Sequence, residues 1–320
     1  MSLFARARAR FTRDLVGVLP PALLVALARS TARLQPLGVF PGWRFAIEET
    51  RPTALVNLRK LIWDRFRDEG LSDPVRVPWY DELVLDLALG NDQSRCLYVS
   101  GSFEPNEFAW LDHAIQPGMT ILDIGANEGF YTTFLAQRVG SSGAVVAFEP
   151  SPRERARLER NVAINGIDNV RIVPKALSDK AGRAVFHVAD AEHNGQNTLG
   201  SFGHKGVNEV ESIEVDVVRL DDVFSEFARV RLDLIKMDVE GAELAVLRGA
   251  AELIARDRPL ILLEVFDAAL RGQGASAADL LDWLRAAHYQ LWAFDETSGQ
   301  LVALNEDPLE SGNVVALPKR

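Results

Sequence analysis

The sequence predicts an α/β protein built on a mainly parallel sheet, and two observations carry this prediction. From residue 119 onward, short apolar runs of strand length alternate with segments of helical spacing, joined by short links. The first run, Thr120–Ile124, passes directly into a turn with two glycines, Gly125–Gly129, and then into a helical segment. Strands connected through helices in this way are expected to be parallel, with right-handed crossovers.

Length and composition set the broad class. A chain of 320 residues that is 48% hydrophobic can bury a large core as one or two domains. Cys96 is the single cysteine, so no internal disulfide is possible, which suits a reducing, cytoplasmic location. The formal charge of -10 argues against nucleic-acid binding. No run reaches the roughly 18 apolar residues that a membrane span needs.

The amino end differs from the rest of the chain. Residues 1–80 carry 13 Lys/Arg against 7 Asp/Glu, a net of +6, so the remainder carries -16. We expect residues 1–75 to form short helices broken by prolines, acting as a cap, an oligomerisation arm or a membrane-surface contact, before a catalytic domain at 76–320. Basic residues ahead of the uncharged run Leu15–Ala28 resemble a signal peptide, but Pro20–Pro21 interrupts that run and no clear cleavage site follows.

The elements follow in order along the chain. Short strands are expected at 84–89 and 97–99, and then a helix from 104 to about 118. In the catalytic region the expected strands are 120–124, 144–149, 170–175, 184–188, 212–218, 232–237, 259–263, 290–294 and 313–317. The expected helices are 129–138, 153–165 with Ser151 as its N-cap, 240–255 and 275–287. Strands 184–188 and 212–218 are expected as an additional antiparallel pair, and the last two strands as an antiparallel hairpin on the sheet edge.

The predicted strand ends carry the candidate chemistry. In open α/β sheets, ligands bind beyond the carboxyl ends of the strands. The residues at those ends are Asp123 with Gly125, Glu149, Lys175 with Ala176, Asp238 with Glu240, and Glu264.

The turn after the first strand narrows the choice of cofactor. Glycines at 125 and 129 allow a sharp turn and a close approach of a ligand, and Glu149 ends the next strand, where an acidic side chain can accept from ribose hydroxyls. A dinucleotide-binding fingerprint has a middle glycine, and Asn127 stands there instead. This disfavours NAD and a dehydrogenase, and fits an adenosyl cofactor without phosphates.

Three motifs resemble a known family. D-I-G-A-N-E-G-F-Y at 123–131, F-E-P at 148–150 and I-K-M-D-V-E-G-A-E at 235–243 are similar to the FkbM-type S-adenosylmethionine-dependent methyltransferases, and the resemblance covers about residues 85–317. It implies a class I, Rossmann-like fold with a seven-stranded, mainly parallel sheet that has one antiparallel strand. It also implies methyl transfer to oxygen, most often a hydroxyl of a sugar, glycan or secondary metabolite; a carboxylate or nitrogen acceptor remains an alternative.

The resemblance also assigns the cofactor, S-adenosylmethionine, to particular residues. Glu104 is expected near its amino group, and Asp123 is expected either to orient the glycine turn or to contact that amino group. The other expected contacts are Gly125, Asn127 and Gly129 under its methionine, Glu149 at its ribose, and Ala176 and Ser178 beside its adenine.

Methyl transfer to a hydroxyl needs a general base within hydrogen-bond reach. Asp238 is the first candidate, because it ends the strand expected next to strand 120–124, and Glu240 is the second. Lys236 lies inside the apolar strand and is expected to pair with Asp238, Glu240 or Glu264, so Lys236→Met should lower activity far more than stability. We expect no metal site, although Asp238 and Glu264 could hold magnesium as an alternative.

The long polar segment Asp190–Val207 is expected to shape the acceptor pocket. Its candidate contacts are His193, Asn194 and Asn197, and a histidine there, including His204, could instead act as the base. A small-molecule or glycan acceptor is the expected partner, with membrane contact or a homodimer through residues 1–75. A non-catalytic module that keeps the cofactor pocket is the competing hypothesis.

Overall fold

The computed structural model describes residues 12–34, 53–227, 231–295, 297–305 and 309–319. The chain forms two compact units. The first comprises Met1–Pro105 with Ala191–His193, and the second comprises Asn106–Asp190 with Asn194–Arg320. Each unit is described by itself, and the domain boundary expected at residue 75 stays a prediction.

The first unit is mainly helical, as expected for the amino end. After a helix at 12–18, its elements are α2 (Pro21–Ala32), α3 (Ala54–Glu69), the antiparallel pair β1 (Val75–Pro78) and β2 (Val84–Leu87), α4 (Asp92–Ser94) and the π-helix η1 (Arg95–Ser100).

Helix α3 organises this unit. Thr53 caps it by accepting from the Val56 N–H, and Gly70, at φ +61°, ends it. Its buried face includes Trp63 and Phe66. Trp43, a further aromatic residue of the amino end, lies outside the described residues.

The strand expected at 97–99 is wrong, because that segment is part of η1. Asn91 and Ser94 form a reciprocal capping box that starts a helix just before this segment. The helical conformation then continues to Gly101, whose φ of +76° ends it. The apolar run at 97–99 is typical of a strand, but the capping box at Asn91 and Ser94 favours a helix.

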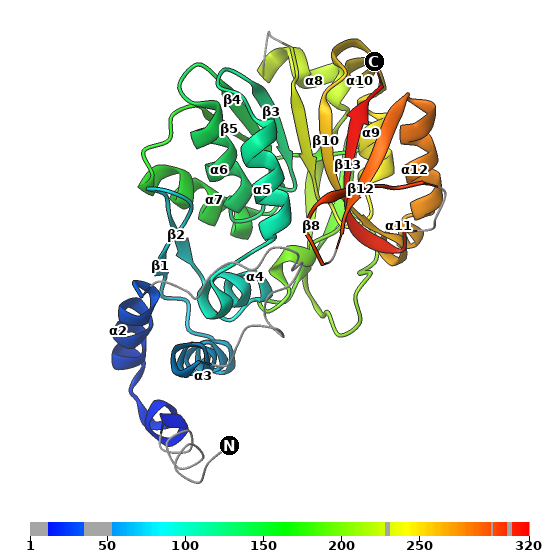
Figure 1. Ribbon diagram of the computed structural model, residues 1–320. Helices are drawn as coiled ribbons and strands as arrows, with labels where there is room; N and C mark the ends of the chain where they lie inside the picture. The colour runs from blue at the N-terminus through cyan, green and yellow to red at the C-terminus, as the bar shows by residue number, and fades with distance from the viewer. Residues whose placement is uncertain (1–11, 35–52, 228–230, 296, 306–308, 320) are drawn as a thin grey trace. The chain divides into compact units, whose positions relative to one another are not determined.

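The second unit holds an eight-stranded sheet with helices on both faces (Figure 1). Its strands are β3 (Thr120–Ile124), β4 (Ala144–Phe148), β5 (Val170–Val173), β9 (Leu234–Met237), β10 (Leu260–Phe266), β11 (Tyr289–Phe294), β12 (Leu301–Ala303) and β13 (Ser311–Pro318). Its helices are α5 (Pro105–Ala114), α6 (Phe130–Val139), α7 (Pro152–Ile164), α8 (Leu220–Phe227), α9 (Glu243–Arg248), α10 (Ala251–Asp257), α11 (Asp267–Gly272) and α12 (Ala277–Ala286). Ser151 precedes α7 as expected, but its hydroxyl donates to Glu154 instead of capping the helix.

The strand order is β5–β4–β3–β9–β10–β13–β11–β12. The first five strands are parallel, and β13 runs antiparallel to both of its neighbours, so the expected mainly parallel sheet with one antiparallel strand is confirmed. The short edge strand β12 is an eighth strand beyond the seven expected, and it also runs antiparallel to its neighbour β11. The expectation that the final pair lies on the edge is wrong for β13, which inserts between β10 and β11. Its residues Val314 to Ala316 are fully buried, as suits a strand with two neighbours.

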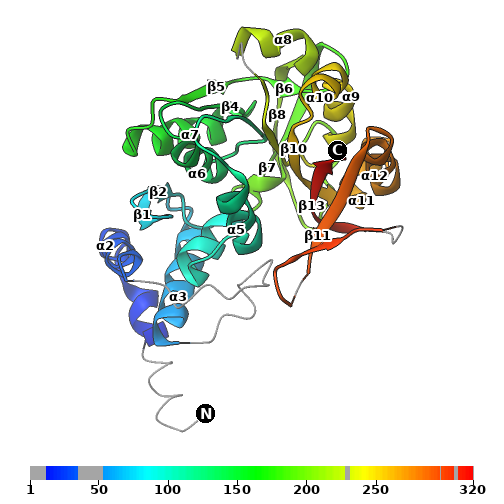
Figure 2. The ribbon, with the colours of Figure 1, turned by 45° about the horizontal axis from the view of Figure 1, so that its top comes forward.

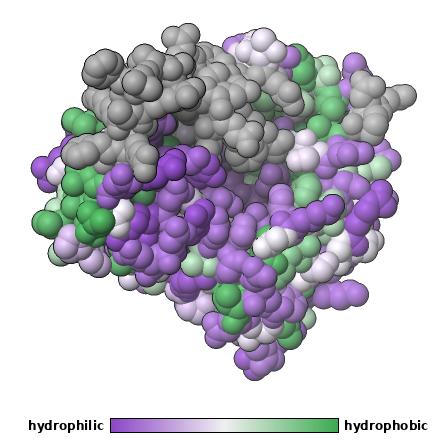
Figure 3. Space-filling view, turned by 90° about the horizontal axis from the view of Figure 1, so that it is seen from below, coloured by the Kyte–Doolittle hydropathy of each residue, from purple (hydrophilic) through white to green (hydrophobic). Residues whose placement is uncertain are grey.

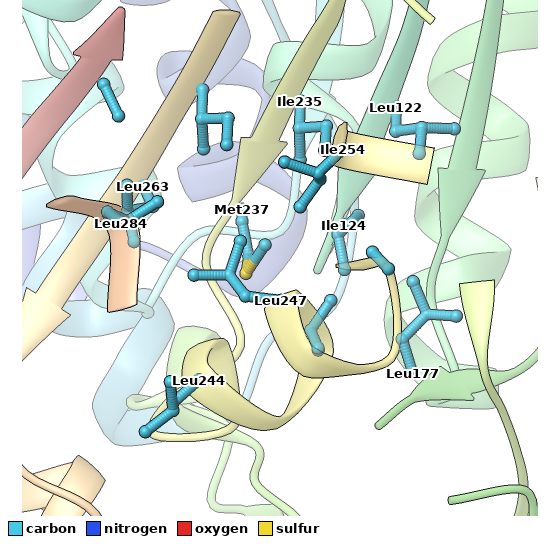
Figure 4. Packing of buried hydrophobic residues seen from close by; sticks show 14 of the residues in the cluster. Leu122, Ile124, Leu177, Ile235, Met237, Leu244, Leu247, Ile254, Leu263 and Leu284 are labelled. Carbon is cyan, nitrogen blue, oxygen red and sulfur yellow. The ribbon is translucent and has the colours of Figure 1, made fainter. Parts of the chain in front are cut away.

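The main core lies between the sheet and the helices α8, α9, α10 and α12. Alternate residues of the parallel strands, such as Leu122, Ile124, Ile235 and Met237, point toward Leu247 of α9 and its neighbours (Figure 4). The opposite face is covered by α6 and α7, and Figure 2 shows the helices divided between the two faces. The site described below therefore rests on a sheet fixed from both sides.

The helix expected at 240–255 is two helices, α9 and α10. Gly249 lies between them, so close to the backbone of Ser178 that a Cβ would stand 2.1 Å from the Ser178 carbonyl oxygen. The chain bends at Gly249–Ala250 and a second helix begins.

The expected additional antiparallel pair is confirmed as β7 (Gly182–Ala189) and β8 (Glu209–Val218), which form a small separate sheet with β6 (Ala176–Leu177). Within the part of the chain that the structure describes, no helix has the length and apolar character needed to cross a membrane.

Candidate active site

The glycine turn joins β3 to α6 at the carboxyl edge of the sheet. Gly125 and Gly129 have φ values of +77° and +85°, in the left-handed region that favours glycine. A Cβ on Gly125 would stand 1.8 Å from the carbonyl oxygen of Asp238, and one on Gly129 would stand 2.5 Å from Leu158 Cδ1. Gly125 is therefore required by its close contact with the backbone of Asp238, and Gly129 is favoured by its positive φ. Both reasons differ from the ligand approach expected from the sequence.

Glu149 follows β4 and is held by the turn. Its Oε2 accepts from the backbone N–H of Asn127 and its Oε1 from the N–H of Ser151, each at 2.8 Å. Burial, together with the charge of Glu154, raises the pKa of Glu149 to about 8 although both N–H donors favour the charged form. Each carboxylate oxygen has a second lone pair, so a fixed carboxylate can still accept from hydroxyls of a bound ribose.

Lys236 and Asp123 are cross-strand neighbours on β9 and β3. The Lys236 ammonium lies 3.8 Å from Asp123 Oδ1 and 3.8 Å from Asp238 Oδ2, donates to the Gly125 carbonyl at 3.4 Å, and lies 4.6 Å from the ring centre of Tyr131. The expected pairing of Lys236 with Asp238 is thus confirmed, and Asp123 is a second partner that the sequence did not indicate.

Asp123 is fully buried, and its Oδ2 accepts from the Thr132 hydroxyl at 2.5 Å. Burial raises the pKa of Asp123, and the nearby charge of Lys236 opposes that shift. Asp123 therefore anchors the lysine beneath the turn.

Three carboxyl groups meet at the ends of β9 and β10. Oxygen atoms of Asp238, Glu240 and Glu264 lie within 4.8 Å of one another, and each side chain is half-buried. Burial and then the charge of Glu264 raise the pKa of Glu240 well above its ordinary value. Oxygen donors at this spacing suit a hard divalent cation, which could use these three carboxylates as ligands. Without a cation, a proton on Glu240 relieves the repulsion.

Glu243, at the start of α9, fixes the loop that carries two of these carboxylates. It is buried, and its Oε1 accepts from the N–H groups of Val239 and Gly241 at 3.2 and 3.1 Å. Burial raises the pKa of Glu243 to about 7. Glu240 itself adopts φ +51°, which is uncommon for a residue with a side chain.

The segment after β7 is fastened to both parts of the site. The carbonyl of Asn194 accepts from Asn127 Nδ2 at 3.2 Å, and the Asn194 amide donates to Glu128 at 2.7 Å. Four residues later, the Thr198 hydroxyl donates to the carbonyl oxygen of Glu240 at 2.8 Å. The segment 194–198 therefore joins the glycine turn to the carboxylate loop.

The family of the chain follows from comparison with known proteins. The model of the FkbM methyltransferase domain matches residues 123–291, just over half of the chain, and the match begins at Asp123 of the glycine turn. The chain belongs to the FkbM methyltransferase family.

Curated relatives agree with this assignment. The 2-O-methyltransferase NoeI of Sinorhizobium fredii is 33% identical over 153 residues, covering 45% of this chain and 62% of NoeI. The 31-O-demethyl-FK506 methyltransferase FkbM of Streptomyces tacrolimicus is 31% identical over 200 residues, covering 52% of this chain and 76% of that protein. A solved structure, a methyltransferase FkbM from Methylobacillus flagellatus, is 15% identical with a TM-score of 0.39, covering 69% of this chain and 51% of that chain. The match thus spans less than two thirds of NoeI.

The fold of this FkbM-family chain is the class I methyltransferase fold that the sequence predicts. Its strand order places β3 and β9 side by side at the centre of the sheet. The carboxyl ends of these two strands carry the glycine turn and Asp238. A topological switch point of this kind, with β4 and β9 on opposite sides of β3, is where open α/β sheets bind ligands.

Some predicted site residues lie elsewhere or have other contacts. Glu104 and His193 belong to the first unit, so the structure does not relate them to the site. Both ends of the Asn197 amide are used within the chain, by Glu154 and by the Ala189 N–H.

Three further predicted site residues, Ala176, Ser178 and His204, lie in the second unit and have other contacts there. Ala176 packs in the small core of the β6–β8 sheet, and the Ser178 hydroxyl donates to Asp179. His204 stacks on Phe266 with ring centres 4.2 Å apart. The roles proposed for all these residues from the sequence stay predictions.

Two buried acidic residues of the site, Glu128 and Glu243, were not predicted from the sequence. Glu128 lies in the glycine turn, where its Oε1 accepts from Arg157 and Asn194. Glu243 ends the I-K-M-D-V-E-G-A-E block and holds the loop before it. A signal was present in both cases, because each acid belongs to a quoted motif, but a carboxylate beside a turn reads equally well as a solvated residue.

Proposed function

We propose that the protein transfers the methyl group of S-adenosylmethionine to a hydroxyl oxygen of a sugar, glycan or secondary metabolite. The observation that carries this proposal is the position of Asp238: it follows the strand next to β3, and its backbone N–H donates to the Ile124 carbonyl at the start of the glycine turn. Support for oxygen as the acceptor atom comes from the names of the relatives NoeI and FkbM, both O-methyl-related.

S-adenosylmethionine, when bound, supplies an electrophilic methyl group whose C–S bond breaks as the acceptor oxygen attacks, leaving S-adenosylhomocysteine. Glu149 is expected to accept from the ribose hydroxyls, because its carboxylate is fixed by two backbone N–H groups. The residues at the sheet edge then act on the acceptor.

Asp238 serves as the general base in this proposal. Its carboxylate accepts the proton of the acceptor hydroxyl as the O–C bond forms, and proximity supplies much of the acceleration. The Lys236 ammonium, 3.8 Å away, places a positive charge beside this carboxylate. Glu240 and Glu264 complete the cluster, and with Asp238 they would hold a divalent cation if one takes part, where it would polarise the acceptor oxygen.

An acceptor screen tests the proposal. Purified protein is incubated with labelled S-adenosylmethionine and a panel of hydroxylated sugars, glycans and metabolites, with carboxylate and amine acceptors included. We expect transfer to a hydroxyl and a loss of about 10²-fold or more in Asp238→Asn, with S-adenosylhomocysteine binding retained. Asp282→Asn, at an exposed site on α12, is the matched control.

Two results would count against this function. Transfer only to carboxylates or amines would change the acceptor class. Cofactor binding without transfer to any acceptor would favour the non-catalytic module.

A further inference from the structure

The helices at the amino end expose apolar side chains. Of the seven large hydrophobic residues that the described chain exposes, four lie between residues 15 and 34. Their exposed fractions are 50% for Leu15, 77% for Val18, 56% for Leu23 and 52% for Leu34. Figure 3 shows one face of the molecule, on which the coloured surface is largely hydrophilic and the hydrophobic residues form separate patches.

These helices are anchored to the first unit by their opposite sides. Val16 is buried, and its carbonyl accepts from the Arg65 guanidinium, which also donates to the Leu19 carbonyl at 3.2 Å. In α2 the buried side includes Leu24 and Ala28. Leu15 and Leu23 are therefore exposed on the outer sides of helices whose opposite sides pack against the first unit.

The exposed residues fall on helical faces. Leu15 and Val18 are three residues apart on the helix at 12–18. On α2, Leu23 and Ala26 share a face with the partly buried Leu27, at spacings of three and four residues. Leu34 is exposed two residues after the end of α2. The outer sides of these two short helices therefore carry large apolar side chains, and on α2 the polar residues Arg29 and Ser30 are exposed as well.

Basic charge accompanies this apolar side. Residues 1–34 contain six arginines and a single acid, Asp14, for a net of +5, while the whole chain carries -10 and the remainder therefore -15. Arg13 and Arg33 flank the apolar faces and are exposed. Arginines beside an apolar helical face are the features that bind the headgroup region of an anionic bilayer.

We propose that the helix at 12–18 and α2 dock on an anionic lipid surface, with Leu15, Val18 and Leu23 entering the headgroup boundary and Arg13 and Arg33 contacting lipid phosphates. A second copy of the chain fits less well, because a two-fold contact would bring the same arginines against each other. In this proposal the helices lie on the bilayer surface, since none of the helices described by the structure is long and apolar enough to cross it.

Vesicle sedimentation of the full chain tests this docking surface. We expect binding to vesicles of phosphatidylcholine with phosphatidylglycerol, weaker binding to phosphatidylcholine alone, and a fall in affinity as salt rises. The triple variant Leu15→Ser, Val18→Ser, Leu23→Ser should bind about tenfold more weakly or worse. Arg13→Glu with Arg33→Glu should remove the preference for the anionic vesicles.

Matched controls keep the test specific. Val185→Ser, Val210→Ser and Val302→Ser change three exposed valines of the second unit, and should leave vesicle binding unchanged. Thermal melts check that each variant folds. Equal binding by the wild type and the Leu15 triple variant, or no binding to anionic vesicles, overturns the proposal. Self-association in sedimentation equilibrium that the triple variant abolishes, without vesicle binding, assigns the surface to a second copy instead.

Discussion

The Asn127 side chain donates to the backbone carbonyl of Asn194, with 3.2 Å between Nδ2 and O, while the Asn127 backbone N–H donates to Glu149. One residue therefore contacts both the carboxylate proposed to hold the cofactor and the segment proposed to shape the acceptor pocket. Thr198 ties the same segment to the Glu240 carbonyl. The position of the acceptor segment thus depends on the glycine turn.

Asn194→Ala tests this dependence. The variant removes the amide donor to Glu128, so we expect a loss of about 1–3 kcal/mol in stability and a several-fold rise in the KM for the acceptor. The affinity for S-adenosylhomocysteine should change little, because Glu149 is held by backbone N–H groups. Steady-state kinetics and calorimetry measure the two effects. Asn208→Ala, at an exposed position near the far end of the segment, is the control, and a KM equal to that of the control would contradict the dependence.

Lys236→Met tests the ion pairs beneath the turn. The sequence alone suggested that activity would fall far more than stability, but Lys236 also faces the fully buried Asp123. Leaving that carboxylate without its cation should cost about 3 kcal/mol of stability. Adding Asp123→Asn should recover most of the stability without the activity, because Asp238 still lacks its cation. Urea unfolding and turnover of both variants give the comparison, and near-normal turnover of the double variant would remove Lys236 from the reaction.

The strand pattern and the strand ends could be predicted from the sequence because apolar runs and short links are local signals. The pairing of Asp123 with Lys236 could not, since it depends on β3 and β9 lying side by side although more than 100 residues separate them. The periodicity of apolar residues does not indicate the order of the strands in the sheet. The break at Gly249 likewise depends on a distant contact, with the Ser178 carbonyl.

The prediction of a strand at 97–99 was wrong because it rested on apolar content alone and did not consider the Asn91 cap, which starts a helix just before η1. For the candidate active site, the sequence indicated which acidic residues lie at the ends of strands. The sequence does not distinguish Glu243, which accepts from backbone N–H groups, from the acids that are proposed to act on a substrate.

Glu243→Gln tests the role of burial at this loop. The pKa of Glu243 is raised from 4.5 to about 7 in the folded protein, so the folded state holds its proton more tightly than the unfolded state. The contribution of Glu243 to the free energy of unfolding is therefore greatest below its ordinary pKa and is lost as the pH rises through 7. The glutamine variant should match the wild type near pH 4.5 and be more stable at pH 8.5, by up to roughly 3 kcal/mol. Thermal melts at the two values measure this; Glu159→Gln, exposed on α7, is the control, and no pH-dependent difference would contradict the assignment.

A chelator distinguishes the two chemistries open to the carboxylate cluster. We expect methyl transfer to persist in excess EDTA, because Lys236 already supplies positive charge 3.8 Å from Asp238. Activity that disappears with EDTA and returns with magnesium would instead place a cation among Asp238, Glu240 and Glu264. Glu264→Gln should then raise the magnesium concentration needed for half-maximal activity.

Calorimetry with S-adenosylhomocysteine tests the central claim, a carboxylate at the end of β4 that holds the cofactor ribose. We predict that the wild-type protein and Glu159→Ala, an exposed control on α7, bind it with the same affinity, and that Glu149→Ala binds it at least about tenfold more weakly while remaining folded. Equal affinity for the Glu149→Ala variant, or no binding by the wild type, would contradict the account.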